Sequence, residues 1–557
     1  MKKRTRIIHL LINLVFFILI GYLFWIQVFD IDDYKQRGIA IRTTDNITLR
    51  GDIKDRNGII LAKDQLIYEV YAHPDLYSKK CSPEMLAGVL SQDLGMSEKE
   101  LLKKLKSKKR NIITVRKNLD RTTAEKIRKH GFRAISVGTV KQRLYPQGSI
   151  GSHIIGYYSY LSQNSMGIEN IANAELESAK SAEKVQRKAN GDIIFGINTD
   201  VKDITTKQKG KDVTLTIDSA IQYICERELA KTINSTHAER GVVIVTDVNN
   251  GEILAYASYP VFDPNKFWKA SGTDMKNWSL TDVYPPGSTF KIITVATALD
   301  LKVLNENSKV LDTGKMKLSK HDEIKNNDIK KFPYPGWITL VYLFEHSSNV
   351  GSANIALMID KDAYYAKLRD FGFGQKTGID LTAESIGLLP KPKTWYKARH
   401  ASMGFGYGAS VTAIQMISAI SAIANGGVWI TPHVIKYSDA ELPKHVIKRR
   451  VISEETSKSV TRLLAKSISN GKTPLNLEKY AVCAKTGTSN KNFKKGGNLV
   501  YASAIGYFPA SSPKIAIYVV IDSPKTGVDY GGTIASPLFR KLATDIGTLL
   551  NISPDKK

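Results

Sequence analysis

The hydrophobic pattern begins with one long apolar run near the N-terminus. Residues 7–29 are apolar except for the strongly polar His9, Asn13 and Gln27, and a basic flank precedes them. A run of about 20 apolar residues can cross a bilayer, and a basic flank stays on the cytoplasmic side. No small-residue cleavage site follows the run, as it would in a secretory signal peptide. The pattern therefore predicts a cytoplasmic tail at 1–6, an uncleaved transmembrane signal anchor at 7–29, and an extracytoplasmic remainder.

A mixed pattern of short strands and helices follows the anchor. Apolar segments at Ile59–Ala62 and Ile67–Tyr71 predict strands, and the stretch from Pro83 to Lys109 predicts helices that carry charge. Residues 178–209 are polar and poor in apolar positions, which is typical of a connection between domains. We therefore expect an N-terminal domain of mixed α/β structure over residues 30–210.

The pattern over residues 211–557 predicts a second, larger domain. A hairpin is expected near its start, because two apolar segments flank an Asn-Asn-Gly turn at residues 249–251. A helical block follows, and the chain then returns to strands and a last helix. The predicted strands are 213–217, 241–247, 253–257, 500–502 and 515–521, and the predicted helices follow Asp218, run over 406–424 and close the chain at 536–549. This order is typical of a layered α+β domain.

Composition and charge narrow the class of partner. The chain has 557 residues, 42% of them hydrophobic, and a formal net charge of +27. Such a basic balance can indicate nucleic acid, but an exported body argues against that class of partner. The charge then suits anionic lipid headgroups or acidic wall polymers. Cys81, Cys225 and Cys483 have no spacing typical of a disulfide framework or a zinc framework, so we do not expect the fold to depend on disulfides.

The sequence YPPGSTFK at residues 284–291 contains the first candidate chemistry. Its prolines and glycine favour a helix start, which places Ser288 and Lys291 one turn apart on a shared face. A serine hydroxyl needs a neighbouring base to act as a nucleophile, and a lysine amine can be that base when burial lowers its pKa. The same spacing at Ser181–Lys184 lies among charged residues, where a solvated helix face is expected.

A second candidate motif, HSSN at residues 346–349, supplies a hydroxyl and an amide two positions apart. The Ser347 hydroxyl could relay a proton, and the Asn349 amide could hold a substrate amide. Taken alone, this spacing is more typical of a turn or a helix cap. It gains meaning only if the fold brings it to Ser288.

The tripeptide Lys-Thr-Gly is a third candidate, and the local pattern distinguishes its copies. The copy at 376–378 follows a glycine-rich loop, and the copy at 525–527 follows a Ser-Pro pair. The copy at 485–487 follows a strand-like run, Tyr480–Ala484. At a strand edge a lysine can attract a carboxylate, glycine permits close backbone approach, and an exposed N–H can stabilise an oxyanion. The selected residues are Lys485, Thr486, Gly487 and Thr488.

With Ser288, Ser347 and Lys485 in this order, the chain resembles penicillin-binding proteins and serine β-lactamases. It looks most similar to a class B penicillin-binding protein, over nearly its whole length. Further matching residues are 50–58, 143–146 and 167–169 in the family's pedestal and 216–218, Gln222, 407–408, Gln415, 424–427 and 530–532 in its transpeptidase domain. The resemblance implies a pedestal or dimerisation-type domain at 30–210 and a penicillin-binding transpeptidase domain at 211–557. No segment resembles the glycosyltransferase domain of class A members.

The resemblance implies a D,D-transpeptidase that crosslinks peptidoglycan and needs no cofactor. Ser288 would attack the D-Ala-D-Ala carbonyl of a stem peptide, with Lys291 as base and Ser347 as proton relay. An amine on a neighbouring stem would then take the acyl group. The implied partners are stem peptides, lipid-linked precursor strands, β-lactams and a membrane glycosyltransferase; whether the process is elongation, division or sporulation stays open.

The same resemblance assigns the substrate contacts. Asn349 would hold the amide of the donor peptide, and Lys485 and Thr486 would hold its terminal carboxylate. The backbone N–H groups of Ser288 and Thr488 would form the oxyanion hole.

One position departs from the family pattern, in which a small inert residue precedes the strand lysine by two. This chain has Cys483 there, and His346 lies next to Ser347. If the motifs converge, a thiolate and an imidazole could form a zinc-type ligand pair. The alternative is that Cys483 is a buried small hydrophobe and His346 an ordinary helix residue.

Two other functions are weighed against transpeptidation. A D,D-carboxypeptidase or β-lactamase would hydrolyse the acyl-enzyme, but the segment Glu384–Gly387 does not match the deacylating motif of class A β-lactamases. The other alternative is a non-catalytic β-lactam sensor or scaffold. Such a protein would not need a complete set of catalytic motifs, so the complete set in this chain counts against it. The large N-terminal domain and the anchor also favour the transpeptidase.

Overall fold

The computed structural model describes residues 2–28, 48–107, 112–177, 209–328, 334, 336–471, 473–491 and 499–556. The polar connection 178–209 and the second Ser-x-x-Lys copy at 181–184 lie outside the described residues, apart from position 209. The chain divides into two compact units that do not follow sequence order. One unit comprises Met1–Gly51, Asp64–Gln142 and Glu177–Lys211, and the other comprises Asp52–Lys63, Arg143–Leu176 and Asp212–Lys557.

The first unit has its own small core. Its elements include α3 (Pro83–Leu94), α4 (Glu98–Leu105), β3 (Ile113–Leu119), α5 (Arg121–Lys129) and most of β2 (Ile60–Ala72) and β4 (Ile135–Leu144). Helix α3 begins where the Ser82 side chain accepts from the Met85 N–H, and it ends at Gly95. Leu86, Leu90 and other apolar side chains pack inside. The helices predicted over 83–109 are confirmed, whereas the two predicted strands are one continuous strand, β2.

Helix α1 (Lys2–Val28) also belongs to the first unit and covers most of the predicted anchor. Position 29 lies outside the described residues. Among the residues that the structure describes, no helix combines the length and the apolar character needed to cross a membrane.

The second unit is built on an antiparallel sheet with strand order β16-β17-β18-β8-β9. Its strands are β16 (Cys483–Asn490), β17 (Val500–Phe508), β18 (Ile515–Asp522), β8 (Arg240–Asp247) and β9 (Ile253–Tyr259). The last strands of the chain thus pair with the first hairpin, because β18 aligns Ile517 with Val245 of β8. Strand β16, which contains the selected Lys-Thr-Gly copy, is left at one edge of the sheet.

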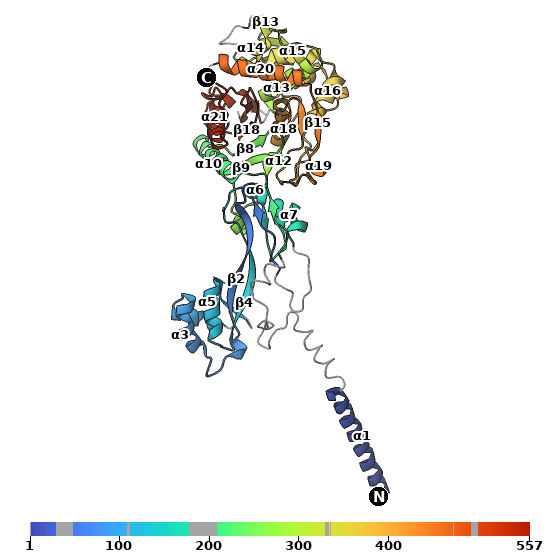
Figure 1. The fold of residues 1–557 in the computed structure, drawn as a ribbon, viewed down its shortest axis with the longest axis vertical. Helices are drawn as coiled ribbons and strands as arrows, with labels where there is room; N and C mark the ends of the chain where they lie inside the picture. Colours follow the sequence, from blue (N-terminus) through green and yellow to red (C-terminus); the bar gives the residue numbers. More distant parts are fainter. Residues whose placement is uncertain are drawn as a thin grey trace. The chain divides into compact units, whose positions relative to one another are not determined.

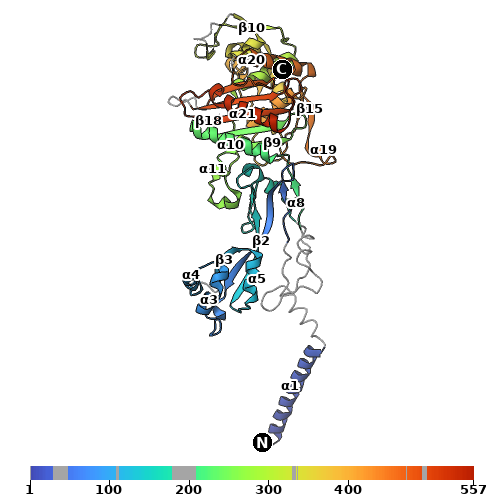
Figure 2. The same ribbon diagram turned by 60° about the vertical axis from the view of Figure 1, so that its left-hand side comes forward.

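Helices cover both faces of this sheet, as Figure 1 and Figure 2 show. Helices α10 (Ser219–Thr236) and α21 (Gly531–Leu549) share one apolar core with the sheet, which includes Val243 and Val245. Helix α18 (Ala413–Ala424) packs on the opposite face with Val242 and Ile244. Successive side chains of a strand point to opposite faces, so β8 supplies both cores. The layered α+β prediction is confirmed for this unit.

A helical block completes the second unit beside α18. It includes α13 (Lys291–Asp300), α14 (Leu340–Glu345), α15 (Asn349–Met358), α16 (Lys361–Asp370), α17 (Lys397–Met403) and α20 (Glu454–Asn470). The helix predicted over 406–424 begins only at Ala413, because Thr412 and Gln415 form a capping box there. Short strands border the block: β10 (Lys309–Asp312), β11 (Lys315–Lys317), β12 (Glu323–Lys325), β13 (Gly336–Thr339), β14 (Val428–Ile430) and β15 (Lys448–Arg450).

The second unit also takes in residues from the N-terminal half of the chain. Their elements are β1 (Ile53–Lys54), α6 (Ser152–Ile155), β5 (Tyr157–Tyr158), β6 (Ser165–Met166), α7 (Ile168–Ile171) and α8 (Asn173–Leu176), and β7 (Val213–Thr214) pairs with β1. A buried ion pair holds this part together, since Arg143 Nε donates to Glu169 Oε1 at 2.6 Å. Tyr145 connects it to the larger part of the unit, because its N–H donates to the Asn265 side chain.

Candidate active site

Ser288 lies in a single 3₁₀ turn, Gly287–Phe290, that leads directly into α13. The sequence pattern predicted that Ser288 lies at or near the first turn of an α-helix. The structure differs in that this turn is a tighter 3₁₀ turn. Gly287 has a backbone φ of +58°, which residues with a side chain rarely adopt. Its N–H donates to the Gly406 carbonyl at 3.2 Å. This bend turns the chain sharply before the helix. Ser288 is partly buried, and its carbonyl accepts from the Lys291 N–H.

The Lys291 side chain is fully buried, and it is the point where two motifs meet. Its Nζ lies 3.1 Å from Ser347 Oγ and 2.8 Å from Asn349 Oδ1, and it also donates to the Ser347 carbonyl. Ser347 lies between α14 and α15, and Asn349 is the first residue of α15. The fold therefore brings together residues that are more than fifty positions apart in the chain.

Burial lowers the pKa of the Lys291 amine well below its ordinary value, and the nearby charge of Lys485 lowers it further. The carboxylates of Asp312 and Asp328 oppose this by raising the pKa. Desolvation is the largest influence, because a buried ammonium loses its hydration. The amine thus becomes available as a proton acceptor at a lower pH than an exposed lysine.

A buried polar network holds the HSSN segment in place. Ser347 has φ +53°, a strained backbone conformation for a residue with a side chain. The next residue, Ser348, donates its hydroxyl hydrogen to Asp312 and accepts from the Gly351 N–H at 2.8 Å, which caps α15. The Asn326 side chain donates to Asp312 at 2.9 Å. These contacts fix the loop whose backbone strain orients Ser347.

The Asn326 side chain also reaches the start of α15. Its Oδ1 accepts the backbone N–H groups of Asn349 at 2.7 Å and Val350 at 3.0 Å. Asp312 and Asn326 are supporting residues to which no sequence pattern pointed. Asp312 follows two apolar residues and Asn326 begins an Asn-Asn-Asp run, so neither position belongs to a recognisable motif, and only the fold brings them to the HSSN loop.

Lys485 lies within strand β16, not after it, and is almost completely buried. The predicted strand at 480–484 is displaced, because the strand begins at Cys483 and runs through the whole motif. The Lys485 Nζ donates to the Thr486 carbonyl at 3.2 Å. Burial lowers the pKa of this amine to about 8. It therefore stays largely protonated at neutral pH.

Close backbone packing places β16 against the Ser288 turn. A side-chain carbon added at Gly487 would lie 2.5 Å from Ser503 Oγ and 2.9 Å from the Thr289 methyl group. Glycine at this position therefore permits the approach of the strand to the turn. Thr488 is held from another side, because its hydroxyl accepts the Gly531 N–H at 3.0 Å. The Ser288 turn and the Lys485–Thr488 strand are thus neighbours in one site.

The other Lys-Thr-Gly copies have different local structures. The Glu384 carboxylate accepts from the Thr377 N–H and hydroxyl at 2.6 Å and from the Gly378 N–H at 3.2 Å. Glu384 is itself buried. In the third copy, the Thr526 hydroxyl donates to Asp529 in an exposed turn. Both copies lie outside helices and strands, and in each the threonine hydroxyl donates to a carboxylate a few residues further along the chain.

The proposed zinc ligands have other neighbours. Cys483 is fully buried, its Sγ donates to the Thr461 carbonyl at 3.3 Å, and burial raises the pKa of the thiol to about 12. The His346 ring stacks on Tyr342, with centroids 4.1 Å apart, and its Nδ1 lies 3.4 Å from Asp328 Oδ2. In the described part of the chain, no three His, Cys, Asp or Glu side chains gather as a metal site requires. The zinc hypothesis stays a prediction that the geometry does not favour.

Comparison with known proteins places the chain in a family. Residues 241–544 match the penicillin binding protein transpeptidase domain, and residues 48–215 match the penicillin-binding protein dimerisation domain. Stage V sporulation protein D of Bacillus subtilis is 32% identical over 528 residues, which cover 91% of this chain and 79% of that protein. The chain belongs to the class B penicillin-binding proteins. The resemblance that the motifs indicated is confirmed.

Other penicillin-binding proteins match over similar lengths. Peptidoglycan D,D-transpeptidase FtsI of Escherichia coli is 30% identical over 549 residues, which cover 96% of this chain and 90% of that protein. The crystal structure of penicillin binding protein 2X from Streptococcus thermophilus has a TM-score of 0.73 at 22% identity, and the match covers 92% of this chain and 81% of that one. The chain therefore has the mixed penicillin-binding fold, with dimerisation and transpeptidase domains.

The Asn326 network should contribute measurably to folding stability. Replacing Asn326 by Ala leaves the Asp312 carboxylate and two backbone N–H groups without this partner. We expect the free energy of unfolding to fall by about 1–3 kcal/mol, the cost of unsatisfied buried polar groups. Chemical denaturation measures it. Asn354→Ala is the matched control, because Asn354 is a partly buried asparagine whose side chain donates to one backbone carbonyl in an exposed hydrogen bond. Equal losses in both variants would contradict the network's role.

Proposed function

We propose that this chain is a peptidoglycan D,D-transpeptidase that works through an acyl-enzyme at Ser288. The observation that supports it most is the buried amine of Lys291. This lysine lies one turn after Ser288, and its amine contacts the side chains of Ser347 and Asn349. The relatives named stage V sporulation protein D and peptidoglycan D,D-transpeptidase FtsI support the same reaction class. The substrate is then the D-Ala-D-Ala end of a stem peptide.

In the acylation step, the neutral Lys291 amine removes the proton from the Ser288 hydroxyl. The hydroxyl oxygen attacks the carbonyl carbon of the penultimate D-Ala, and the N–H groups of Ser288 and Thr488 stabilise the oxyanion. The peptide bond breaks, and terminal D-Ala leaves after it receives a proton through Ser347. The low pKa of Lys291 supports its role as base, and its contact with Ser347 Oγ supports the relay.

Substrate binding falls to the groups around the nucleophile. The Lys485 ammonium attracts the terminal carboxylate together with the Thr486 hydroxyl, and Asn349 holds the donor amide. The two buried lysines then act in opposite protonation states, which fits their different surroundings.

Transfer of the acyl group to an amine of a neighbouring stem peptide completes the crosslink. Hydrolysis of the acyl-enzyme is the rival outcome. Glu384 is not placed to activate water in the manner of a deacylating glutamate, because its carboxylate accepts hydrogen bonds from the backbone N–H groups of Thr377 and Gly378. We propose a membrane glycosyltransferase, which polymerises lipid-linked strands, as the partner of the N-terminal domain, and β-lactams as acylating inhibitors.

We further propose that residues 7–29 anchor the protein in the cell membrane, with residues 1–6 in the cytoplasm. The unbroken apolar run and its basic flank support this. The proposed domains are a pedestal at 30–210 and a transpeptidase domain at 211–557. Zinc at Cys483 and His346 remains a separate prediction, which metal analysis of the purified protein would test.

The anchor proposal predicts where the protein partitions. The full chain should sediment with membranes and resist a high-salt wash, whereas a variant lacking residues 2–29 should be released, because the apolar run holds the chain by insertion. Protease added to intact spheroplasts should digest the remainder of the full chain. Recovery of the full chain in the soluble fraction would overturn the anchor.

The nucleophile assignment is tested by Ser288→Ala. This variant should take up no covalent label from a fluorescent penicillin, because the replacement removes the only oxygen that the mechanism acylates. Ser279→Ala is the matched control, since Ser279 is a serine of the same unit outside the candidate site. Gel fluorescence and intact mass measure the label. Retained labelling of the Ser288→Ala protein would refute the mechanism.

The two lysines predict a bell-shaped pH dependence of acylation. The rate constant should rise with pH as Lys291 loses its proton, and fall as pH passes about 8, where Lys485 loses the charge that binds the carboxylate. Lys485→Arg should retain slower acylation but move the alkaline limb upward, because a guanidinium does not lose its proton in this range. Stopped-flow labelling measures both profiles. An alkaline limb unchanged by Lys485→Arg would exclude Lys485 as its source.

A further inference from the structure

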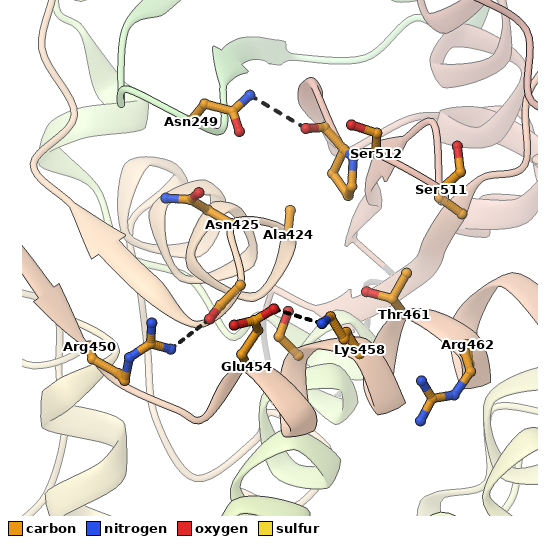
Figure 3. Close-up of a pocket in the computed structure, with 14 residues that line it drawn as sticks. Asn249, Ala424, Asn425, Arg450, Glu454, Lys458, Thr461, Arg462, Ser511 and Ser512 are labelled. Atoms are coloured by element: carbon orange, nitrogen blue, oxygen red, sulfur yellow. Dashed lines mark hydrogen bonds and ion pairs between the residues drawn. The ribbon is translucent and has the colours of Figure 1, made fainter.

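A pocket of about 500 Å³ lies in the larger unit, apart from the candidate active site. Figure 3 shows its lining, which comes from the β8–β9 turn, the end of α18, strand β15, helix α20 and the β17–β18 turn. None of the candidate catalytic or substrate-binding residues lines it. Its volume falls in the range of small-molecule sites, which is about 300–1,000 Å³.

The charged side chains of the pocket lie along one side, and neutral polar ones such as Asn249 and Ser512 lie opposite (Figure 3). Lys458 forms an ion pair with Glu454 at 2.6 Å, and Arg462 is directed to Glu306, which is not a lining residue. Three cationic side chains therefore line the pocket beside the single carboxylate of Glu454.

Arg450 is the cation best suited to a ligand. Its Nη1 donates to the backbone carbonyls of Gly426 at 2.8 Å and Ile452 at 3.2 Å. Within the described residues, no ion pair of 4.0 Å or less joins it to a carboxylate. Backbone carbonyls orient the guanidinium without neutralising it. Glu454 forms its ion pair with Lys458, and its pKa is lowered mainly by Lys458 and less by Arg450, so the Arg450 charge is only partly balanced. A guanidinium also matches the planar geometry of phosphate and carboxylate groups.

We propose that this pocket is a binding site for a small anion with several phosphate or carboxylate groups, and that helix α20 couples its occupancy to strand β16. Such an anion would bridge Arg450 and Lys458 along the charged side. It would accept hydrogen bonds from Asn249, Ser511 and Ser512 on the opposite side.

The coupling runs through Thr461, which is both a lining residue of the pocket and a contact of the main sheet. Its carbonyl accepts from Cys483 Sγ at 3.3 Å, and its hydroxyl lies 2.8 Å from the Tyr507 hydroxyl. Cys483 begins β16, two residues before Lys485. A ligand that shifts or stiffens α20 therefore acts directly on the strand that carries the substrate-binding lysine.

Helix α20 is also joined to the end of the helix that follows the nucleophile. Asp300, the last residue of α13, accepts the Ser453 N–H at 2.8 Å and the Thr456 hydroxyl at 3.2 Å. The helix thus contacts the elements that carry Lys291 and Lys485. This gives the pocket a physical route to both sides of the candidate active site.

Binding is tested on the full chain carrying Ser288→Ala, so that the result does not depend on the proposed reaction. Isothermal titration with tripolyphosphate and with tetraglutamate separates a phosphate ligand from a carboxylate ligand. At least one should bind saturably at a single site. Arg450→Ala and Lys458→Ala should each weaken that binding about tenfold, the loss of one charge-assisted hydrogen bond.

Lys541→Ala is the matched control, because Lys541 also forms an i,i+4 ion pair on an exposed helix face, with Asp545 at 2.7 Å. It should leave the affinity unchanged. Absence of saturable binding by both probes would overturn the site. An equal loss of affinity in Lys541→Ala would do the same, since it would show general attraction to a basic surface.

Coupling is tested by hydrogen exchange at residues 483–490 in the same Ser288→Ala protein. The bound probe should change exchange there. The double variant Cys483→Ala/Thr461→Val removes both the thiol that donates to the Thr461 carbonyl and the Thr461 hydroxyl near Tyr507, so it should bind the probe but abolish that change. Unaltered exchange at saturation would overturn the coupling.

The functional readout, which rests on the proposed acylation, is the rate of penicillin labelling of the chain with Ser288 intact. It should change about fivefold when the probe is bound. An unchanged rate at saturation would also count against the coupling. Failure of that protein to label under any condition would refute the role of Ser288, while the binding and exchange results would still decide the pocket.

Discussion

The candidate site depends on a lysine amine taken out of water. Lys291 is fully buried, and its Nζ is held by Ser347 and Asn349. Burying an amine without such partners would be costly, and burying it with them lowers its pKa instead. Burial thus produces a lysine amine with a lowered pKa, which is the property that a serine nucleophile needs in a neighbouring base. The rest of the larger unit supports this position.

That support comes from layers placed around one sheet. Helix α13 carries Lys291 and packs into the block beside the sheet, while the edge strand β16 carries Lys485. Close approach at Gly487 keeps the strand against the Ser288 turn. The strained backbone of Ser347 is held by the Asp312 and Asn326 network. Strain of this kind persists only where surrounding contacts determine the conformation.

The two lysines of the candidate site share one physical influence, which is burial. Both are buried, and burial lowers the pKa of both amines. The charge of Lys485 lowers the pKa of Lys291 further, whereas burial is the one influence on the pKa of Lys485. Helix α20 contacts the elements that carry both lysines, which is why a pocket that it lines is relevant to the site.

The sequence by itself determined the fold class of the larger unit, because alternating and helical apolar patterns report which side chains face a core. It also determined the motif residues, because Ser288 and Lys291 are a local pair and the flanking pattern set Lys485 apart from its rival copies. Tertiary structure alone decided that Lys291 contacts Ser347 and Asn349, that β16 begins at Cys483, and that Asp312 and Asn326 support the HSSN loop. These contacts join residues far apart in the chain, and no local pattern specifies which distant partner a buried polar group will meet.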